Sequence, residues 1–126
     1  VLGEASQTVR GWGGKFYFVF LPGFESIAFP GLRDVTPDNW HERCAANEIP
    51  DYLCNKNNKE ELLSRNKVLE IASSVSDRTI YPLGEMAKDP DPLSFLPLRI
   101  PNHFNSKGYR VIAEIILPYL KKDLLK

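Results

Sequence analysis

The residues best suited to chemistry lie near the C-terminal end, where His103 stands on a loop just before a strongly patterned helix. A histidine can accept and return a proton near neutral pH because its ordinary pKa is close to that range. The loop follows a predicted strand, and ligands of open α/β sheets bind beyond the carboxyl ends of the strands. We therefore interpret His103 as a candidate general base. The alternative is that it only caps the helix or packs on Phe104.

Two further kinds of reactive side chain occur, and both carry weaker signals. His41 lies in an irregular, charged segment and is typical of an ordinary surface residue. Cys44 and Cys54 enclose nine residues, and His41 would be the only nearby nitrogen ligand, whereas a zinc site needs about four ligands. No metal or other cofactor is therefore predicted. The two cysteines either form a disulfide in an oxidising compartment or remain free thiols, and the sequence leaves both the pairing and the compartment open.

The composition is ordinary for a globular domain and shows no charge bias. The 126 residues are 43% hydrophobic and 25% charged, and 16 basic side chains balance 16 acidic ones. A net charge of zero gives no electrostatic reason to expect nucleic acid or an anionic membrane as the partner. No apolar run reaches the roughly 18 residues of a transmembrane helix. The length fits one domain, and a start at Val1 without methionine leads us to expect that further residues precede it.

The elements that must position His103 follow a helix–strand–helix–strand order. Residues 2–12 predict a helix that ends at glycines, and residues 15–22 predict a continuous apolar strand. Residues 58–76 predict a second helix and residues 78–83 a second strand, which together complete a right-handed βαβ crossover with parallel strands. A continuous apolar strand is buried on both faces and needs neighbours on both sides, and two strands alone are marginal. We therefore expect the chain to be part of a larger α/β sheet.

The two longest predicted helices carry distinct sequence signals. The helix 58–76 has candidate caps and first-turn acids at its start: Asn57, Asn58, Glu60 and Glu61. Its covered face is expected to consist of Leu62, Arg65, Val68, Leu69, Ala72 and Val75. The last helix starts near Ser106, and Pro118 is expected to kink it or shift its last turns. Its covered face is expected to consist of Tyr109, Ile112, Ala113, Ile116 and Leu120.

Residues 23–56 form an irregular segment that is interrupted by prolines. A weakly structured segment of this length is more often a lid or binding loop than a core element, so we interpret it as a loop insertion beside the site. A helical turn is predicted at 37–46, with Trp40 packing inward. Four apolar residues of this segment suit either an acyl chain or the core: Phe24, Ile27, Phe29 and Leu32.

The block that resembles a known family is residues 103–114, HFNSKGYRVIAE. It resembles the last motif block of the SGNH (GDSL-type) hydrolases, in which a histidine precedes an N-x-x-G-[YH]-x-x-[IV]-A-[EK] run that opens the C-terminal helix. Residues 16–22 look like one of the family's central strands, and residues 68–87 look like its helix–strand unit before the histidine loop. The resemblance implies a flavodoxin-like three-layer α/β/α sandwich with parallel strands, of which residues 1–126 are the C-terminal part of a single domain.

The family implies a Ser-His-Asp catalytic set, and this chain matches only part of it. No Gly-Asp-Ser block and no Gly-x-Asn-Asp block occur, so the nucleophile and the oxyanion donors are expected upstream of this chain. The family usually has an aspartate three residues before the histidine, where this chain has Ile100. The acid is expected from Asp89, Asp91 or Glu85, or the set works as a Ser-His pair.

Two further motif positions have structural roles by the same resemblance. Asn105 is expected to cap the final helix rather than to touch substrate. Gly108 is expected to let that helix pack closely against the loop before it.

The resemblance implies an ester hydrolase in which His103 takes the proton of an upstream serine, with a small-molecule or glycan ester as substrate. The isolated chain is expected to be inactive, because the nucleophile belongs to the N-terminal half of its own domain. An alternative from another class is a non-catalytic SGNH-like domain that binds a glycan or a protein partner, and Ile100 in the acid position favours it. No cofactor, nucleic acid or transmembrane segment is expected.

Overall fold

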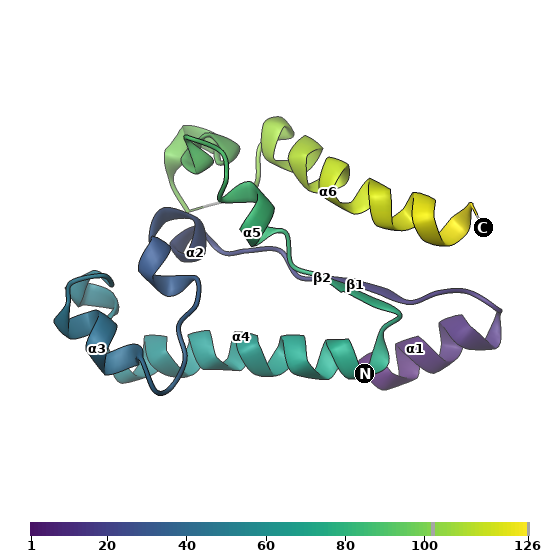
Figure 1. Ribbon diagram of the computed structural model, residues 1–126, viewed down its shortest axis with the longest axis horizontal. Coiled ribbons are helices and arrows are strands. Elements are labelled where there is room, and N and C mark those ends of the chain that lie inside the picture. The colour runs from purple at the N-terminus through teal and green to yellow at the C-terminus, as the bar shows by residue number, and fades with distance from the viewer. Residues whose placement is uncertain (102, 126) are drawn as a thin grey trace. The chain divides into compact units, whose positions relative to one another are not determined.

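The computed structural model describes residues 1–101 and 103–125 as a mixed α/β structure that is mostly helical and contains a small two-stranded parallel sheet (Figure 1). The chain divides into two compact units. The first comprises Val1–Phe20 and Asp34–Ile80, and the second comprises Leu21–Arg33 and the residues from Tyr81 onward. The expected α/β character with parallel strands is confirmed.

The sheet of the first unit is formed by β1 (Tyr17–Val19) and β2 (Arg78–Ile80), which pair in parallel. Backbone hydrogen bonds extend the pairing at both ends, from the Phe20 N–H to the Ile80 carbonyl (2.9 Å) and from the Asp77 N–H to the Phe16 carbonyl (2.8 Å). Both strands are shorter than predicted. β1 is flanked by glycine and lysine on one side and by Pro22 on the other, and the chain turns into a helix shortly after β2.

The expectation that the first strand is buried on both faces is wrong for β1 in this structure. Its three residues, Tyr17, Phe18 and Val19, are all half-buried. Within the described residues β1 has one strand neighbour, β2, so this sheet is narrower than the covered sheet from which the expectation came. Aromatic side chains partly shield the strand instead, as in the tilted contact of Phe18 with Phe20 at 6.4 Å between ring centroids.

Two helices accompany this sheet in the first unit. The predicted first helix is confirmed as α1 (Leu2–Gly11), and the predicted second helix is α4 (Lys56–Val75). Figure 1 shows α1 beside the C-terminal end of α4, where the Ser6 hydroxyl donates a hydrogen bond to the Val75 carbonyl. The covered face of α4 is confirmed, since every residue predicted for it is buried or half-buried, including Arg65 and Ala72.

The start of α4 differs from the prediction. The cap is Asn55, whose side-chain oxygen accepts a hydrogen bond from the Asn58 N–H at 3.0 Å. The helix therefore begins two residues earlier than predicted, Asn57 and Asn58 are not its caps, and the predicted acids lie beyond its first turn. Several neighbouring asparagines could cap the helix, and the cap is Asn55, whose backbone is extended as an N-cap residue requires.

The segment before α4 is more ordered than predicted. It contains α3 (Trp40–Ala45) and a 3-10 helix (Asp51–Leu53), and the Cys44–Cys54 disulfide joins them. The expected inward packing of Trp40 is confirmed, since it is 3% exposed. The cysteine alternative left open by the sequence is thus a disulfide in this structure. The other buried apolar residues of this segment are Val35, Ile49 and Leu53.

The second unit is built from short helices around one long helix. Its elements are α2 (Phe24–Ala28), α5 (Leu83–Met86), α6 (Ser106–Leu124) and 3-10 helices at Pro30–Leu32, Pro92–Phe95 and Pro97–Arg99. Its core cluster consists of Ile27, Leu83, Met86, Phe95 and Ile112. Ile27 and Leu32, two of the candidate acyl-chain residues, are therefore core residues.

The predicted covered face of the last helix is only partly right. Ile112 is buried, and Ile116 and Leu120 are half-buried, but Tyr109 is 49% exposed and Ala113 is exposed as well. The side of α6 that faces the core carries Gly108, Val111 and Ile115 in addition to the predicted Ile112 and Ile116. The helix continues through Pro118 to Leu124.

Candidate functional site

His103 is exposed on the loop immediately before α6, and the helix start behind it is firmly held. The Asn105 side-chain oxygen accepts from the Gly108 N–H at 3.0 Å, which satisfies one of the N–H groups that a helix start leaves unpaired. The Asn105 side-chain amide also donates to the Ser94 carbonyl at 2.8 Å, and its backbone N–H donates to the Phe95 carbonyl at 2.9 Å. The expected capping role of Asn105 is confirmed, and it fixes the loop two residues after His103.

Gly108 confirms the expected close approach between α6 and this loop. A Cβ atom at this position would lie 2.8 Å from the Phe95 carbonyl oxygen and 2.9 Å from the Phe104 ring. Distances below about 3.0 Å are essentially never tolerated by a real Cβ atom. The backbone oxygen is itself held by the Asn105 N–H, so it has little freedom to move away.

Two ion pairs tie the loop ahead of His103 together. Both terminal nitrogens of Arg99 donate to the Asp91 carboxylate, each at 2.6 Å, in the two-pronged geometry that makes arginine–carboxylate pairs specific. Hydrogen bonding by Arg99, followed by its positive charge, holds the pKa of Asp91 below its ordinary value. Lys107 donates to the Ser94 hydroxyl at 2.6 Å and lies 3.5 Å from the Asp89 carboxylate.

These pairings bear on the acid that would orient the histidine. Asp91 pairs with Arg99, Asp89 with Lys107, and Glu85 with Lys88 at 2.7 Å. Each of the three candidate carboxylates is thus already engaged by a cation. Ile100, in the motif's acid position, is 50% exposed.

The same loop contains two residues in an unusual backbone conformation. Leu98 and Arg99 have φ angles of 53° and 60°, in the left-handed region that residues with a Cβ atom rarely occupy. Leu98 is also 87% exposed, which is uncommon for a leucine. Such outliers persist only where surrounding contacts hold them, and here the Arg99–Asp91 ion pair does so. No sequence signal marks this turn, because glycine or asparagine would be the expected residue.

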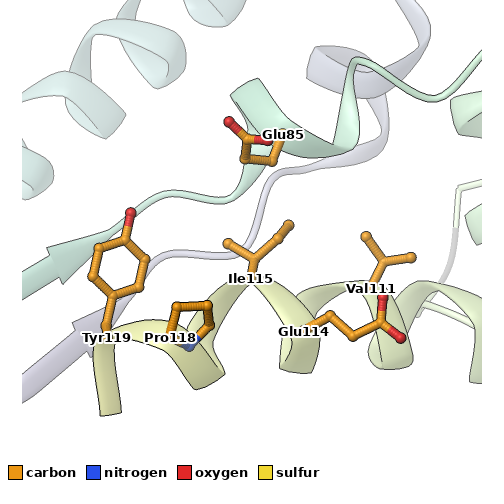
Figure 2. Close-up of a pocket in the computed structure, with 6 residues that line it drawn as sticks. All are labelled: Glu85, Val111, Glu114, Ile115, Pro118 and Tyr119. Carbon is orange, nitrogen blue, oxygen red and sulfur yellow. The ribbon is translucent and has the colours of Figure 1, made fainter. Parts of the chain in front are cut away.

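A groove lies between α5 and α6, and the sequence analysis did not predict it. It is an open groove of about 440 Å³ lined by Glu85, Val111, Glu114, Ile115, Pro118 and Tyr119. Figure 2 shows the Val111, Ile115 and Tyr119 side chains rising from α6 toward α5, which carries Glu85. A signal was present in the apolar spacing of Val111, Ile115 and Pro118, a second row on α6 beside the predicted one.

The groove and His103 are separate places on the second unit. The groove walls come from α6 residues 111–119 and from α5, whereas His103 precedes the helix. The structure therefore does not bring His103 into this groove.

The other reactive residues noted in the sequence, His41 and the two cysteines, lie away from any metal-binding arrangement in the described residues. His41 is exposed on α3, and Cys44 and Cys54 are bonded to each other. Within residues 1–101 and 103–125, no group of three or more histidine, cysteine, aspartate or glutamate side chains is placed to hold a metal ion. None of the helices described here combines the length and the hydrophobicity that crossing a membrane requires.

Comparisons with protein families, with curated proteins and with solved structures found no match for this chain. The resemblance to the SGNH hydrolases therefore depends on the residues of the His103 block themselves.

Proposed function

We propose that this chain is the C-terminal part of a serine-dependent ester hydrolase of the SGNH type, with His103 as the general base. The observation that carries the proposal is the exposed His103 directly before a helix that is capped by Asn105 and closely packed at Gly108. These are the roles that the resembling motif gives to the three positions. The parallel pair β1–β2 is compatible with the finer fold that we propose, a flavodoxin-like three-layer sandwich with further strands.

In this proposal the imidazole of His103 accepts the proton of a serine hydroxyl as the oxygen attacks the ester carbonyl. The same proton then passes to the alkoxide leaving group, and water repeats the cycle to release the acid. No Gly-Asp-Ser block occurs among the 126 residues, so the serine comes from outside this chain. In this proposal the acid of the catalytic set is Asp89, Asp91 or Glu85, or the set works as a Ser-His pair without an acid.

The test is hydrolysis of p-nitrophenyl acetate by the chain joined to its natural upstream sequence. We expect His103→Ala to lower kcat/KM by at least about 100-fold, the contribution typical of a general base. The control is His41→Ala, which removes the other histidine, exposed on α3, and should leave the rate unchanged. Equal rates for the parent and the His103→Ala variant would sink the proposal.

A second candidate is a non-catalytic SGNH-like domain that binds a glycan or a protein partner. The specific observation in its favour is Ile100, which stands in the acid position of the resembling motif and is 50% exposed. This candidate expects no Gly-Asp-Ser-like block upstream and no ester hydrolysis. It expects saturable binding of a glycan or protein that a variant such as Leu98→Asp weakens, since Leu98 is exposed on the same loop.

A further inference from the structure

The groove between α5 and α6 combines an apolar wall on α6 with two carboxylates. On α6, Val111, Ile115 and Tyr119 recur at four-residue spacing and so share one side of the helix, next to Pro118 (Figure 2). Eight residues of helix span about 12 Å, which gives the wall the length of a medium alkyl chain. A volume of about 440 Å³ lies within the range of small-molecule pockets.

The charged groups of the groove are both carboxylates. Glu85 stands on α5, and Glu114 stands on α6. Among the described residues no cation forms an ion pair with Glu114, and Glu85 is paired only with the exposed Lys88, at 2.7 Å. An ionised carboxylate accepts hydrogen bonds and cannot donate them.

Pro118 also lines the groove, and its ring adds apolar surface beside Glu114. The groove thus places two carboxylates beside apolar side chains of α6. The complementary ligand carries several N–H donors and a positive charge on an apolar body.

We propose that this groove binds a small organic cation with an aliphatic chain, of the primary alkylammonium class. The ammonium group is held by Glu114, with Glu85 across the groove, and the alkyl chain lies over Val111 and Ile115. Lys88 occupies Glu85 in the unliganded groove and therefore competes with the ligand. This site is independent of His103 and of ester hydrolysis.

The test is a nuclear magnetic resonance titration of the 126-residue chain, with the ligand represented by hexylammonium. Three comparison probes isolate the contributions: hexanoate reverses the charge, hexanol removes it, and methylammonium removes the chain. We expect hexylammonium to shift the methyl signals of Val111 and Ile115 with saturation, and each comparison probe to bind at least about fivefold more weakly. Binding should weaken in high salt, because the carboxylates are exposed.

Variants make the assignment specific. Glu114→Gln keeps the shape of the side chain and removes its charge, and we expect the affinity for hexylammonium to fall about threefold. Lys88→Met removes the competitor of Glu85, and we expect the affinity to rise about twofold to threefold. The matched control is Lys67→Met, which breaks an exposed pair of the same spacing with Glu70 (3.0 Å) on α4, away from the groove, and should change nothing.

Several outcomes would overturn the proposal. Equal binding of hexanol or hexanoate would show an unselective apolar surface. Shifts confined to residues outside the groove would place the site elsewhere. A lysine-containing amphipathic peptide that binds at least a hundredfold more tightly than hexylammonium would make the groove a docking site for a protein partner instead. An unchanged affinity in Lys88→Met would remove the competition on which the charge argument depends.

Discussion

The two long helices of this protein begin with the same kind of cap, but the segments before them are closed by different interactions. At the start of α4 the Asn55 side chain accepts from the Asn58 N–H, and at the start of α6 the Asn105 side chain accepts from the Gly108 N–H, each at 3.0 Å. Ahead of α4 the Cys44–Cys54 disulfide closes the segment covalently. Ahead of α6 the loop is closed by the exposed Arg99–Asp91 ion pair and by hydrogen bonds.

The difference shows where this chain keeps a reversible contact. A disulfide does not respond to pH or salt, whereas an exposed ion pair responds to both. The loop closed by the ion pair contains the left-handed residues Leu98 and Arg99 and leads into His103. Functional loops are commonly drawn from the less stable parts of a fold. Each of the following predictions removes or alters one of these stabilising contacts, from the largest expected effect on stability to the smallest.

Removal of the disulfide should have the largest effect. Cys44 and Cys54 are 10 residues apart, and opening a loop of this size is expected to cost about 3 kcal/mol of unfolding free energy. The measurement is the denaturation midpoint of a Cys44→Ala, Cys54→Ala variant, followed through buried Trp40 in a Trp12→Phe background. The parent under reducing conditions should behave like the variant. A midpoint unchanged by both treatments would show that the bond contributes nothing to the first unit.

Gly108→Ala should come next, because it attacks the loop ahead of α6 by steric overlap. The added Cβ would lie 2.8 Å from the Phe95 carbonyl oxygen, and overpacking of this kind typically costs about 2 kcal/mol. The matched control is Gly84→Ala on α5, where no atom outside the local helix backbone lies within 4 Å of the new Cβ. That control should be neutral or slightly stabilising, since alanine favours a helix. Similar denaturation midpoints for the two variants would contradict the packing argument.

Much of the first unit could be predicted from local patterns, because a helix that must cover a surface repeats its apolar residues every three or four positions. This repeat located α1, α4 and the covered face of α4, including Arg65. The cap was misplaced because asparagine occurs at 55, 57 and 58, and composition does not say which one is extended. The sequence offered a Cys44–Cys54 disulfide as one of two alternatives, and the choice between them depends on a fold that brings the two cysteines together.

The second unit was less predictable, because more of its features depend on contacts between residues that are far apart in the sequence. Asn105 and Gly108 could be assigned because their roles are local to the helix start. The groove could not be predicted, because Glu85 and Glu114 lie far apart in the sequence and line one groove only through the packing of α5 on α6. The left-handed turn at Leu98 is held by a side-chain pair rather than by its own residue preferences.

The two asparagine caps provide a matched pair with a smaller effect. Asn55→Ala should cost about 1 kcal/mol, the usual price of a lost cap. Asn105→Ala should cost more, about 2 kcal/mol, because its amide also donates to the Ser94 carbonyl at 2.8 Å. The measurement is hydrogen exchange at the Asn58 and Gly108 amides, each of which loses its acceptor. An equal loss of protection from hydrogen exchange at the two amides would show that the hydrogen bond from Asn105 to Ser94 adds no stability.

The smallest effect, and the one that separates the two fastenings by chemistry, is the pH dependence of the Arg99–Asp91 ion pair. Hydrogen bonding by Arg99 lowers the pKa of Asp91 from its ordinary value of 3.8. The stabilisation is therefore fully present above pH 3.8 and is lost as the pH falls through the lower pKa of the folded state. Asp91→Asn should lower Tm slightly at neutral pH, and its difference from the parent should shrink toward zero on acidification. High salt at neutral pH should shrink it too, because both side chains are exposed. A Tm difference that grows on acidification would show that this carboxylate is not held in its charged form by Arg99.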